Sequence, residues 1–281
     1  MSAPRIDLHT HSTASDGTTP PARLVQEARD AGLDVVALTD HDTTSGWGEA
    51  ADALPQGLRL VRGAEVSCAS GGISLHLLAY LFDPLEPVFA AARLRLRESR
   101  VGRAELMAKR LEDAGTGVTW QRVQELAGGT VGRPHVAQAL VEAGVVGTVG
   151  EAFTSEWIGN GGRFHVSKVE LDVVEAVEMV VAAGGVAVFA HPAANKRGRT
   201  VGDDVVREMA AAGLAGLEVD HVDHDDAGRA HLRELAAELG LLTTGSSDFH
   251  GENKTVQLGA ETTAPEAFER IVALASGVPV L

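Results

Sequence analysis

The chain has 281 residues, 44% of them hydrophobic, which suits one large α/β domain or a domain with an insertion. Its net charge of −15 disfavours a binder of duplex DNA, which needs a basic surface. The single cysteine, Cys68, excludes an internal disulfide framework, and we expect it to be buried. No apolar run approaches the ~20 residues of a transmembrane helix and no signal peptide is visible, so we expect a cytoplasmic protein with no membrane partner.

Strand-like and helix-like segments alternate along most of the chain. Apolar alternation and short apolar runs predict strands over residues 5–9, 34–42, 58–68, 72–82, 185–192, 215–221 and 241–250. Amphipathic patterns with Pro and Gly at their ends predict helices over residues 19–33, 45–54, 171–185, 203–214, 226–240 and 265–277. Strands and helices that alternate in this way favour a parallel α/β barrel or a doubly wound sheet.

Residues 86–165 interrupt this alternation. They contain one long helical pattern, rich in Arg and Ala, followed by several shorter ones, and no strand pattern. We therefore predict a helical insertion over residues 86–165, with residues 1–85 and 166–281 forming the α/β part. We interpret the basic residues of the long helix as a solvated face: Arg93, Arg95, Arg97, Arg100 and Arg103.

Histidines and carboxylates gather where the predicted strands end. His9 and His11 end the first strand at i, i+2 spacing, which projects both side chains to the same side. The corresponding residues of the later segments are Asp16, Asp40, His41, Glu65, His76, His191, Glu218, His221, Asp248 and His250. In a parallel barrel, chemistry takes place at the carboxyl ends of the strands. Any one of these histidines alone is more often solvated or structural than a metal ligand.

Taken together, the pattern indicates bound cations, because buried charges need partners. Six imidazoles and three carboxylates without sulfur suit Mn, Fe or Zn, and ligand type alone does not choose among them. We expect two or three divalent ions, with manganese first and iron or zinc as alternatives.

The sequence resembles the PHP (polymerase and histidinol phosphatase) family of metal-dependent phosphoesterases. The resemblance is carried, in order, by HTHSTASDG, ALTDHDT, GAEVS, His76 within ISLHLLAY, AHP and GSSDFH, and it spans residues 6 to 259, insertion included. It implies a distorted (β/α)7 barrel that binds up to three metals. It also implies three groups of ligands: His9, His11, Glu65 and Asp248; then Glu65 as a bridge with His76 and His191; then Asp16, His41 and His250. No ligand position is substituted, which argues against a non-catalytic copy.

Clustered metals suit hydrolysis of a phosphate ester, because they lower the pKa of a bridging water and neutralise charge in the transition state. A metal-bridging hydroxide would attack phosphorus, and an acid would protonate the leaving oxygen. The candidates for this acid are His221, His224 and Asp40, which the sequence does not rank; His224 is equally a candidate for binding the substrate.

Within the family, the chain resembles the branch of 3′,5′-nucleoside bisphosphate phosphatases and 5′→3′ exonucleases of short RNA. This resemblance runs through GRPHVAQALVEAG and FTSEWIGNGGRFHV, and it implies that Arg133 and His135 lie near the substrate phosphate. An arginine gives a planar fork for phosphate oxygens, although Arg133 could also be a plain helix N-terminal residue. The chain departs from the branch in two places: His165 replaces a tyrosine, and HPAANKRGR replaces His-Pro-x-Arg-Tyr. Either Lys196, Arg197 and Arg199 take over the role of that arginine, or they are surface residues of a loop and do not bind the substrate.

Rival functions remain open from the sequence. The nearest is a histidinol-phosphate phosphatase, or another small-molecule phosphatase, followed by an amide or lactone hydrolase on the same metal scaffold. A third is a non-catalytic metal-binding accessory module. We expect a small nucleotide or a short oligonucleotide as the substrate; the sequence does not indicate an oligomeric state.

Overall fold

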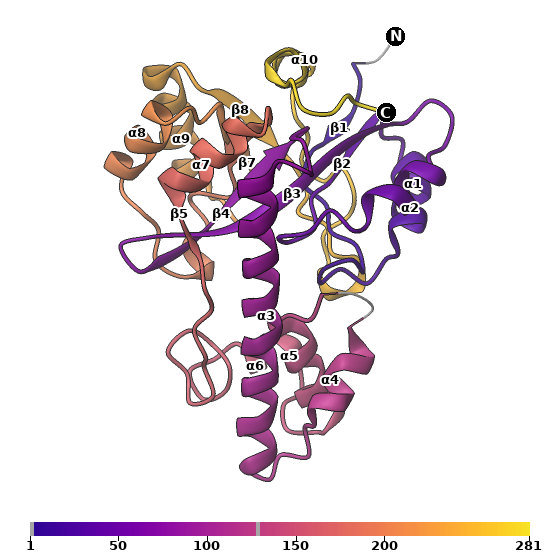
Figure 1. Ribbon diagram of the computed structural model, residues 1–281, viewed down its shortest axis with the longest axis vertical. Helices are drawn as coiled ribbons and strands as arrows, with labels where there is room; N and C mark the ends of the chain where they lie inside the picture. Colours follow the sequence, from indigo (N-terminus) through magenta and orange to yellow (C-terminus); the bar gives the residue numbers. More distant parts are fainter. Residues whose placement is uncertain (1–2, 128–129) are drawn as a thin grey trace.

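The computed structural model describes residues 3–127 and 130–281 and has a curved, nearly closed sheet (Figure 1). Its hydrogen-bonded strand order is β1-β2-β3-β4-β6-β7-β8, and β5 pairs with β3 outside this path. A parallel bridge between Thr10 and Phe249 joins the segments that follow β1 and β8. These strands are Ile6–Asp7, Val35–Leu38, Arg59–Ser70, Ile73–Tyr80, Val186–Phe189, Gly216–Asp220 and Leu242–Gly245; β5 is Leu171–Asp172. The predicted distorted (β/α)7 barrel is confirmed.

Helices cover the outer face of this sheet, and α10 lies across the end of the barrel opposite the helical segment (Figure 1). The barrel helices are α1 (Pro21–Asp30), α2 (Trp47–Asp52), α7 (Val173–Ala182), α8 (Asp203–Ala211), α9 (Asp226–Leu239) and α10 (Pro265–Leu274). In β2, Val35 and Ala37 belong to the inner core, whereas Val36 and Leu38 belong to the core beneath the helices. The inner core also includes Phe268 of α10. The strands are therefore buried on both faces, as their continuous apolar runs predict.

Strand β4 runs against the rest of the barrel, which corrects the expectation of an all-parallel sheet. β4 is antiparallel to both β3 and β6, and the turn at Gly71 and Gly72, with φ of 55° and 75°, joins it directly to β3. A glycine adopts such angles without steric cost. His76 therefore lies near the start of β4, which is at the same end of the barrel as the carboxyl ends of the parallel strands. Glu65 does not end its strand as predicted, because β3 continues to Ser70.

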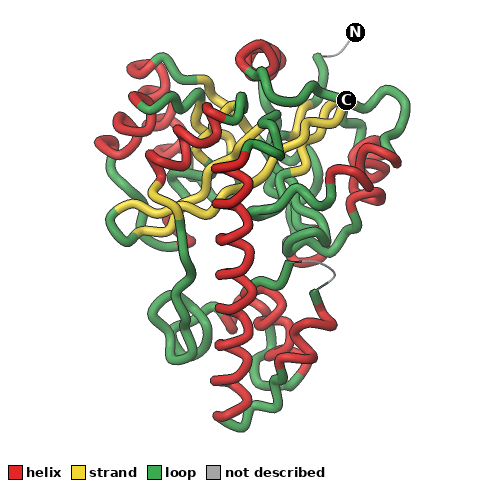
Figure 2. The backbone as a smooth tube through the Cα atoms, viewed as in Figure 1, coloured by secondary structure: helices red, strands yellow, loops and turns green. Residues whose placement is uncertain are grey.

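The helical segment between β4 and β5 extends away from the barrel (Figures 1 and 2). It contains α3 (Pro87–Asp113), α4 (Trp120–Leu126), α5 (Arg133–Glu142) and α6 (Val149–Ala152). Two short 3₁₀ turns, Asn195–Arg197 and Gly251–Asn253, lie in the loops after β6 and β8. Helix α3 belongs to two cores: Phe89 and Leu96 pack in the barrel core, whereas Met107 and Leu111 pack with α4 and α5. The division of the chain at residues 86 and 165 stays a prediction.

The arginines of α3 do not form a solvated face. Arg95 is exposed, but Arg93, Arg100 and Arg103 are only 5–6% exposed. Their spacing places these three on the same side of the helix as Leu96 and Met107, so they point at the protein. Our interpretation of these three residues was wrong, because it relied on their residue type and not on the side of the helix on which they lie.

Within the described part of the chain, no helix is both long enough and apolar enough to cross a membrane.

Candidate metal centre and adjoining cavity

All nine predicted ligands meet at the mouth of the barrel. Three groups of side chains bring one potential ligand atom each to within 4.8 Å of one another: His9, His11, Glu65 and Asp248; His11, Asp16, His41 and His250; and His41, Glu65 and His76. The first group is as the resemblance implied. The other two differ from it: His11 joins Asp16, His41 and His250, and His41 takes the place of His191 beside Glu65 and His76. His191 belongs to none of the three groups, but its Nε2 lies 3.0 Å from Glu65 Oε1. That these residues bind metal stays a prediction.

Glu65 lies at the centre of the cluster and touches both sides of it. Its Oε1 lies 2.7 Å from His76 Nδ1 and 3.0 Å from His191 Nε2. Its Oε2 lies 3.1–3.3 Å from ring nitrogens of three further histidines, His9, His11 and His41. The carboxylate is 2% exposed, so water cannot compensate its charge. This position fits a carboxylate that bridges two cations, as the resemblance implied for Glu65.

Asp16 holds the far side of the cluster. Its oxygens lie 3.5 Å from His250 Nε2, 3.6 Å from His41 Nε2 and 3.8 Å from His11 Nδ1. Burial opposes the ionisation of Asp16, but the nearby imidazoles, led by that of His41, hold its pKa well below the ordinary value. Burial lowers the pKa of His250 to about 3. His250 is therefore neutral at pH 7, which is the form that binds a metal.

Several ring nitrogens of the cluster face one another or the central carboxylate without forming regular hydrogen bonds. His9 Nε2 and His11 Nε2 lie 3.0 Å apart, so a proton on both would be repulsive. The buried Nδ1 atoms of His41 and His76 lie 3.1 and 2.7 Å from Glu65 oxygens, but among the described residues neither makes a hydrogen bond of normal geometry. Buried polar atoms without partners are costly. A divalent cation offers lone pairs of this kind a partner, so the residues present fit the metals that the family pattern implies.

Two neighbouring groups fix the orientation of ligating rings. His9 Nδ1 donates to Glu218 Oε1 at 2.9 Å, which leaves its Nε2 lone pair directed at the cluster. His250 Nδ1 donates to the Asp248 carbonyl oxygen at 2.8 Å, with the same effect on its Nε2. Such outer partners set the tautomer and the basicity of metal-binding histidines.

Glu218 is a functional residue to which the sequence assigned no role. Besides His9, it accepts hydrogen bonds from the His191 backbone N–H, at 2.7 Å, and from the Ser246 hydroxyl. It is fully buried on β7, and although burial opposes its ionisation, His9 and further imidazoles hold its pKa well below the usual range. The available signal was an acidic residue inside the apolar run of this strand.

Backbone strain borders the cluster. The ligand candidates His191 and Asp248 have φ of 33° and 54°, and Asp42, next to His41, has φ of 57°. These left-handed conformations are unfavourable for residues with a Cβ atom. Asp42 is held by the Ser67 N–H at 2.7 Å and by Arg100 Nη2 at 3.0 Å.

The three candidates for the general acid differ in orientation. Asp40 is buried, and its oxygens accept hydrogen bonds from the Ser12 hydroxyl and the Ser15 hydroxyl, each at 2.6 Å. His224 donates from Nδ1 to the Val219 carbonyl oxygen at 2.8 Å and accepts at Nε2 from the Ala193 N–H at 3.2 Å. Both residues are thus engaged in holding loops of the site, which argues against a role in proton transfer.

His221 is the candidate that faces the cluster. Its Nδ1 accepts from the Asp223 N–H at 3.0 Å, so in the neutral ring the proton sits on Nε2. That Nε2 lies 3.4 Å from Asp248 Oδ2 and has no hydrogen-bond partner among the described residues.

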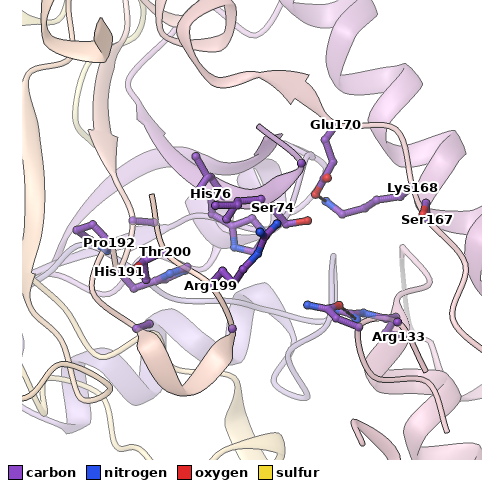
Figure 3. A pocket seen from close by; sticks show the side chains of 18 of the residues that line it. Ser74, His76, Arg133, Ser167, Lys168, Glu170, His191, Pro192, Arg199 and Thr200 are labelled. Atoms are coloured by element: carbon purple, nitrogen blue, oxygen red, sulfur yellow. Dashed lines mark hydrogen bonds and ion pairs between the residues drawn. The ribbon is translucent and has the colours of Figure 1, made fainter. Parts of the chain in front are cut away.

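A cavity of about 620 Å³ opens beside the cluster, between the barrel and the helical segment. His76 and His191 form one wall, and Arg133, Lys168 and Glu170 lie across from His191 (Figure 3). Its other charged or titratable wall residues are Arg103, His165 and Arg199.

Of the other residues predicted to bind the substrate, some line this cavity and others lie outside its wall. Arg133 lines it, and its Nη1 donates to Asn160 Oδ1 at 2.8 Å. His135 is buried outside the cavity wall, where its Nδ1 accepts the Gly132 N–H at 3.0 Å and so caps α5. Of the loop after β6, Arg199 lines the cavity, Lys196 is exposed, and the side chain of Arg197 lies outside the described residues.

Comparisons with known proteins agree with this geometry. The PHP domain matches residues 7–110. A 5′-3′ exoribonuclease of Haemophilus influenzae is 35% identical over 91% of this chain and 93% of its own length. A 3′,5′-nucleoside bisphosphate phosphatase of Chromobacterium violaceum is 35% identical over 87% of each chain. A solved structure from Bifidobacterium adolescentis, assigned as a metal-dependent phosphoesterase, has a TM-score of 0.91 and 35% identity, with 98% of each chain covered.

The barrel and its cluster of imidazoles and carboxylates define a metal-dependent phosphoesterase, a hydrolase of phosphoric esters. The chain belongs to the PHP domain family, as the motifs around its histidines indicated.

Proposed function

We propose that this enzyme hydrolyses the 3′-phosphate ester of 3′,5′-nucleoside bisphosphates, with the 5′ end of short RNA as a second substrate class. The observation that carries this proposal is the cavity that opens on His76 and His191. In a protein of net charge −15, its wall carries Arg103, Arg133 and Lys168. A pocket so rich in cations suits a small substrate with several negative charges.

The cluster is suited to two or three divalent ions, and we favour manganese. When bound, such ions activate water and neutralise the charge of the phosphoryl group. The ligand set of imidazoles and carboxylates without sulfur supports Mn over softer metals, with Fe or Zn as alternatives. His9, His11, Glu65 and Asp248 would hold one ion, Glu65, His76 and His191 a second, and Asp16, His41 and His250 a third.

Two side chains of the protein then act on the substrate itself. Arg133 directs its guanidinium into the cavity and would hold the oxygens of the phosphate that is cleaved, as a planar fork of donors. As the bond between phosphorus and the leaving oxygen breaks, that oxygen needs a proton. His221 would relay it, because its Nε2 carries the ring proton and faces the cluster, and the proton that the attacking water loses would return to the ring.

The relatives support nucleotides as substrates more than histidinol phosphate or an amide. Two of them are an exoribonuclease and a nucleoside bisphosphate phosphatase. A third, from Eggerthella lenta, is a phosphoribosyl 1,2-cyclic phosphate 1,2-diphosphodiesterase, 32% identical over 88% of this chain, which also acts on a sugar phosphate. A solved structure from Chromobacterium violaceum, with bound sulfate and no metal, is described as an amidohydrolase. It is 31% identical to this chain, with a TM-score of 0.85, and the match covers 99% of this chain and 97% of its own. Hydrolysis of an amide is therefore included in the test below.

Steady-state assays with Mn²⁺ test the proposal. The substrates are adenosine 3′,5′-bisphosphate, a short 5′-phosphorylated RNA, histidinol phosphate and a simple amide. We expect the bisphosphate to give the highest kcat/KM and Arg133→Ala to lower it by about tenfold or more, as for the loss of a charged hydrogen bond. Faster hydrolysis of histidinol phosphate or the amide, or full activity of Arg133→Ala, would contradict the proposal. No hydrolysis of any compound would favour the accessory module.

A further inference from the structure

Lys254 reaches the metal-ligand cluster from the loop that follows β8, and the reaction described so far gives it no role. Its Nζ lies 2.6 Å from Asp248 Oδ2 and 3.4 Å from the Asp248 carbonyl oxygen. The Asp248 side chain is 2% exposed, whereas that of Lys254 is 31% exposed. A lysine ammonium is a compact point charge. The protein thus supplies a cation of its own to a carboxylate that we expect to bind a metal.

The two carboxylate oxygens of Asp248 face different partners. Oδ1 lies 3.4 Å from the Nε2 atoms of both His9 and His11. Oδ2 lies beside the Lys254 ammonium and 3.4 Å from His221 Nε2. Oδ1 is therefore the oxygen that lies among the proposed ligands. A divalent ion bound there would share one carboxylate with the ammonium of Lys254.

The turn that precedes Lys254 is built into the site. Gly251 has φ of 66°, and a Cβ atom at this position would lie only 2.1 Å from Thr18 Oγ1, so the turn requires glycine. Asn253 Nδ2 donates to the Asp16 carbonyl oxygen at 2.9 Å. These contacts fix the turn against the loop of another ligand candidate, Asp16, and they hold the ammonium at the metal centre.

The charge of Lys254 has opposite effects on the empty and the filled site. The three ligand candidates that are carboxylates, Asp16, Glu65 and Asp248, are buried. Buried carboxylates need a counter-charge, and in the absence of metal the ammonium supplies one. Two or three divalent ions outweigh the charge of three carboxylates. The same ammonium then adds to an excess of positive charge and repels the ions.

We propose that Lys254 is an internal cation that competes with the metal: it stabilises the metal-free enzyme and lowers its affinity for the ion held by His9, His11, Glu65 and Asp248. The inference rests on the metal ligands of the proposed function and not on its substrate. It adds to them a residue that sets the metal concentration at which the site fills. The enzyme can then lose this ion while Asp248 keeps a counter-charge.

Melting temperatures in excess chelator test the effect on the empty site. Lys254→Met removes the charge and keeps a side chain of similar length, and Lys254→Arg keeps the charge. Lys109→Met, at an exposed position of α3, controls for the loss of a lysine elsewhere. We expect Lys254→Met to lower the melting temperature of the metal-free enzyme by about 2–8 °C, because a buried carboxylate loses a partly exposed partner. Lys254→Arg and Lys109→Met should stay close to the wild type.

Competition with a chelator for Mn²⁺ tests the filled site on the same proteins. Lys254→Met should bind Mn²⁺ about tenfold more tightly than the wild type, because the repulsion between the ammonium and the ion is gone. Lys254→Arg and Lys109→Met should not show this gain. A misfolded variant cannot produce a gain in affinity, so higher affinity together with lower metal-free stability supports the inference.

Two results would overturn the inference and leave the proposed function intact, because neither involves a substrate. The first is weaker or unchanged Mn²⁺ binding by Lys254→Met, since Lys254 would then orient Asp248 for the metal or have no effect on it. The second is an unchanged melting temperature of metal-free Lys254→Met. Failure of the wild type to bind Mn²⁺ would overturn the ligand set of the proposed function and the inference with it. Absence of hydrolysis by an enzyme that binds Mn²⁺ would contradict the proposed function alone.

Discussion

Arg100 is the side chain through which α3 reaches the metal-ligand loops, and its removal should be costly. Its Nε and Nη2 donate to Asp42 Oδ2 at 3.1 and 3.0 Å, and Nη2 also donates to the Ser67 hydroxyl at 2.8 Å. Burial opposes the ionisation of Asp42, but Arg100, followed by Lys168, keeps its pKa below the ordinary value. Arg100→Met leaves this buried carboxylate without its main counter-charge.

The loss of one partner from a buried ion pair typically costs about 3–5 kcal/mol. Asp42 keeps hydrogen bonds from the Ser67 N–H and hydroxyl, at 2.7 and 2.8 Å, so we expect the lower end, about 3 kcal/mol. Asp42 has a strained backbone and is adjacent in the chain to the metal-ligand candidate His41. Loss of the contact between Arg100 and Asp42 should therefore also weaken metal binding at His41. The expected result is a lower free energy of unfolding and less bound manganese per chain.

Urea unfolding in excess chelator measures the first effect, and metal analysis after equilibration with limiting Mn²⁺ measures the second. Arg97→Met is the matched control one turn earlier. Arg97 is partly exposed and, within the described part of the chain, donates only to the Thr43 hydroxyl, at 3.3 Å, so we expect a loss below about 1 kcal/mol. Arg100→Met combined with Asp42→Asn should recover part of the loss, because both buried charges are then gone. Equal losses for Arg97→Met and Arg100→Met would refute the reasoning.

Three further predictions follow from the site. Glu218→Gln frees the rings and backbone that it orients and should weaken manganese binding by about tenfold to a hundredfold in a chelator competition; unchanged affinity would contradict its positioning role. The KM for adenosine 3′,5′-bisphosphate should rise as the pH passes about 8, because Lys168 on the cavity wall loses its proton there and the pocket loses a positive charge; a KM that stays flat through this range would exclude Lys168 from the binding site. Metal removal should lower the melting temperature, because the carboxylates of the cluster lose their cations, and Mn²⁺ should restore it; a scan that is insensitive to both treatments would count against a metal centre.

The convergence of the site was predictable because it depends on strand direction and side-chain alternation alone. Parallel strands place their carboxyl ends at one mouth, and i, i+2 spacing turns His9 and His11 to the same side. The barrel was predicted from this alternation and from the resemblance, the family from the motifs around the histidines, and both are confirmed. That the nine side chains act as metal ligands stays a prediction, although the structure brings all of them together.

What the sequence missed depends on contacts between distant segments. Apolar periodicity is the same in parallel and antiparallel strands, so the reversal of β4 was not visible in it. The roles of Asp40 and His224 depend on hydrogen bonds to Ser12, Ser15 and the backbone at Ala193, which no spacing reveals. Arg100 and Arg103 were assigned to solvent by residue type, whereas the helix face they share with Leu96 and Met107 is buried.

The reversal of β4 also explains why α3 is so long. β4 ends at Tyr80 beside Gly63, far from the mouth, so the chain must travel back along the outside of the barrel before it can contribute to the site. The 27 residues of α3 span about 40 Å at 1.5 Å each, enough for this return and for a further stretch beyond it. The length of the helix before each arginine thus sets its position along the barrel: Arg100 reaches the ligand loops, and Arg103 reaches the cavity. Deletion of a single residue before Arg100 would turn everything after it by about 100°, and loss of a whole turn would shift both arginines by about 5.4 Å, so the part of the helix before Arg103 cannot change length without displacing them.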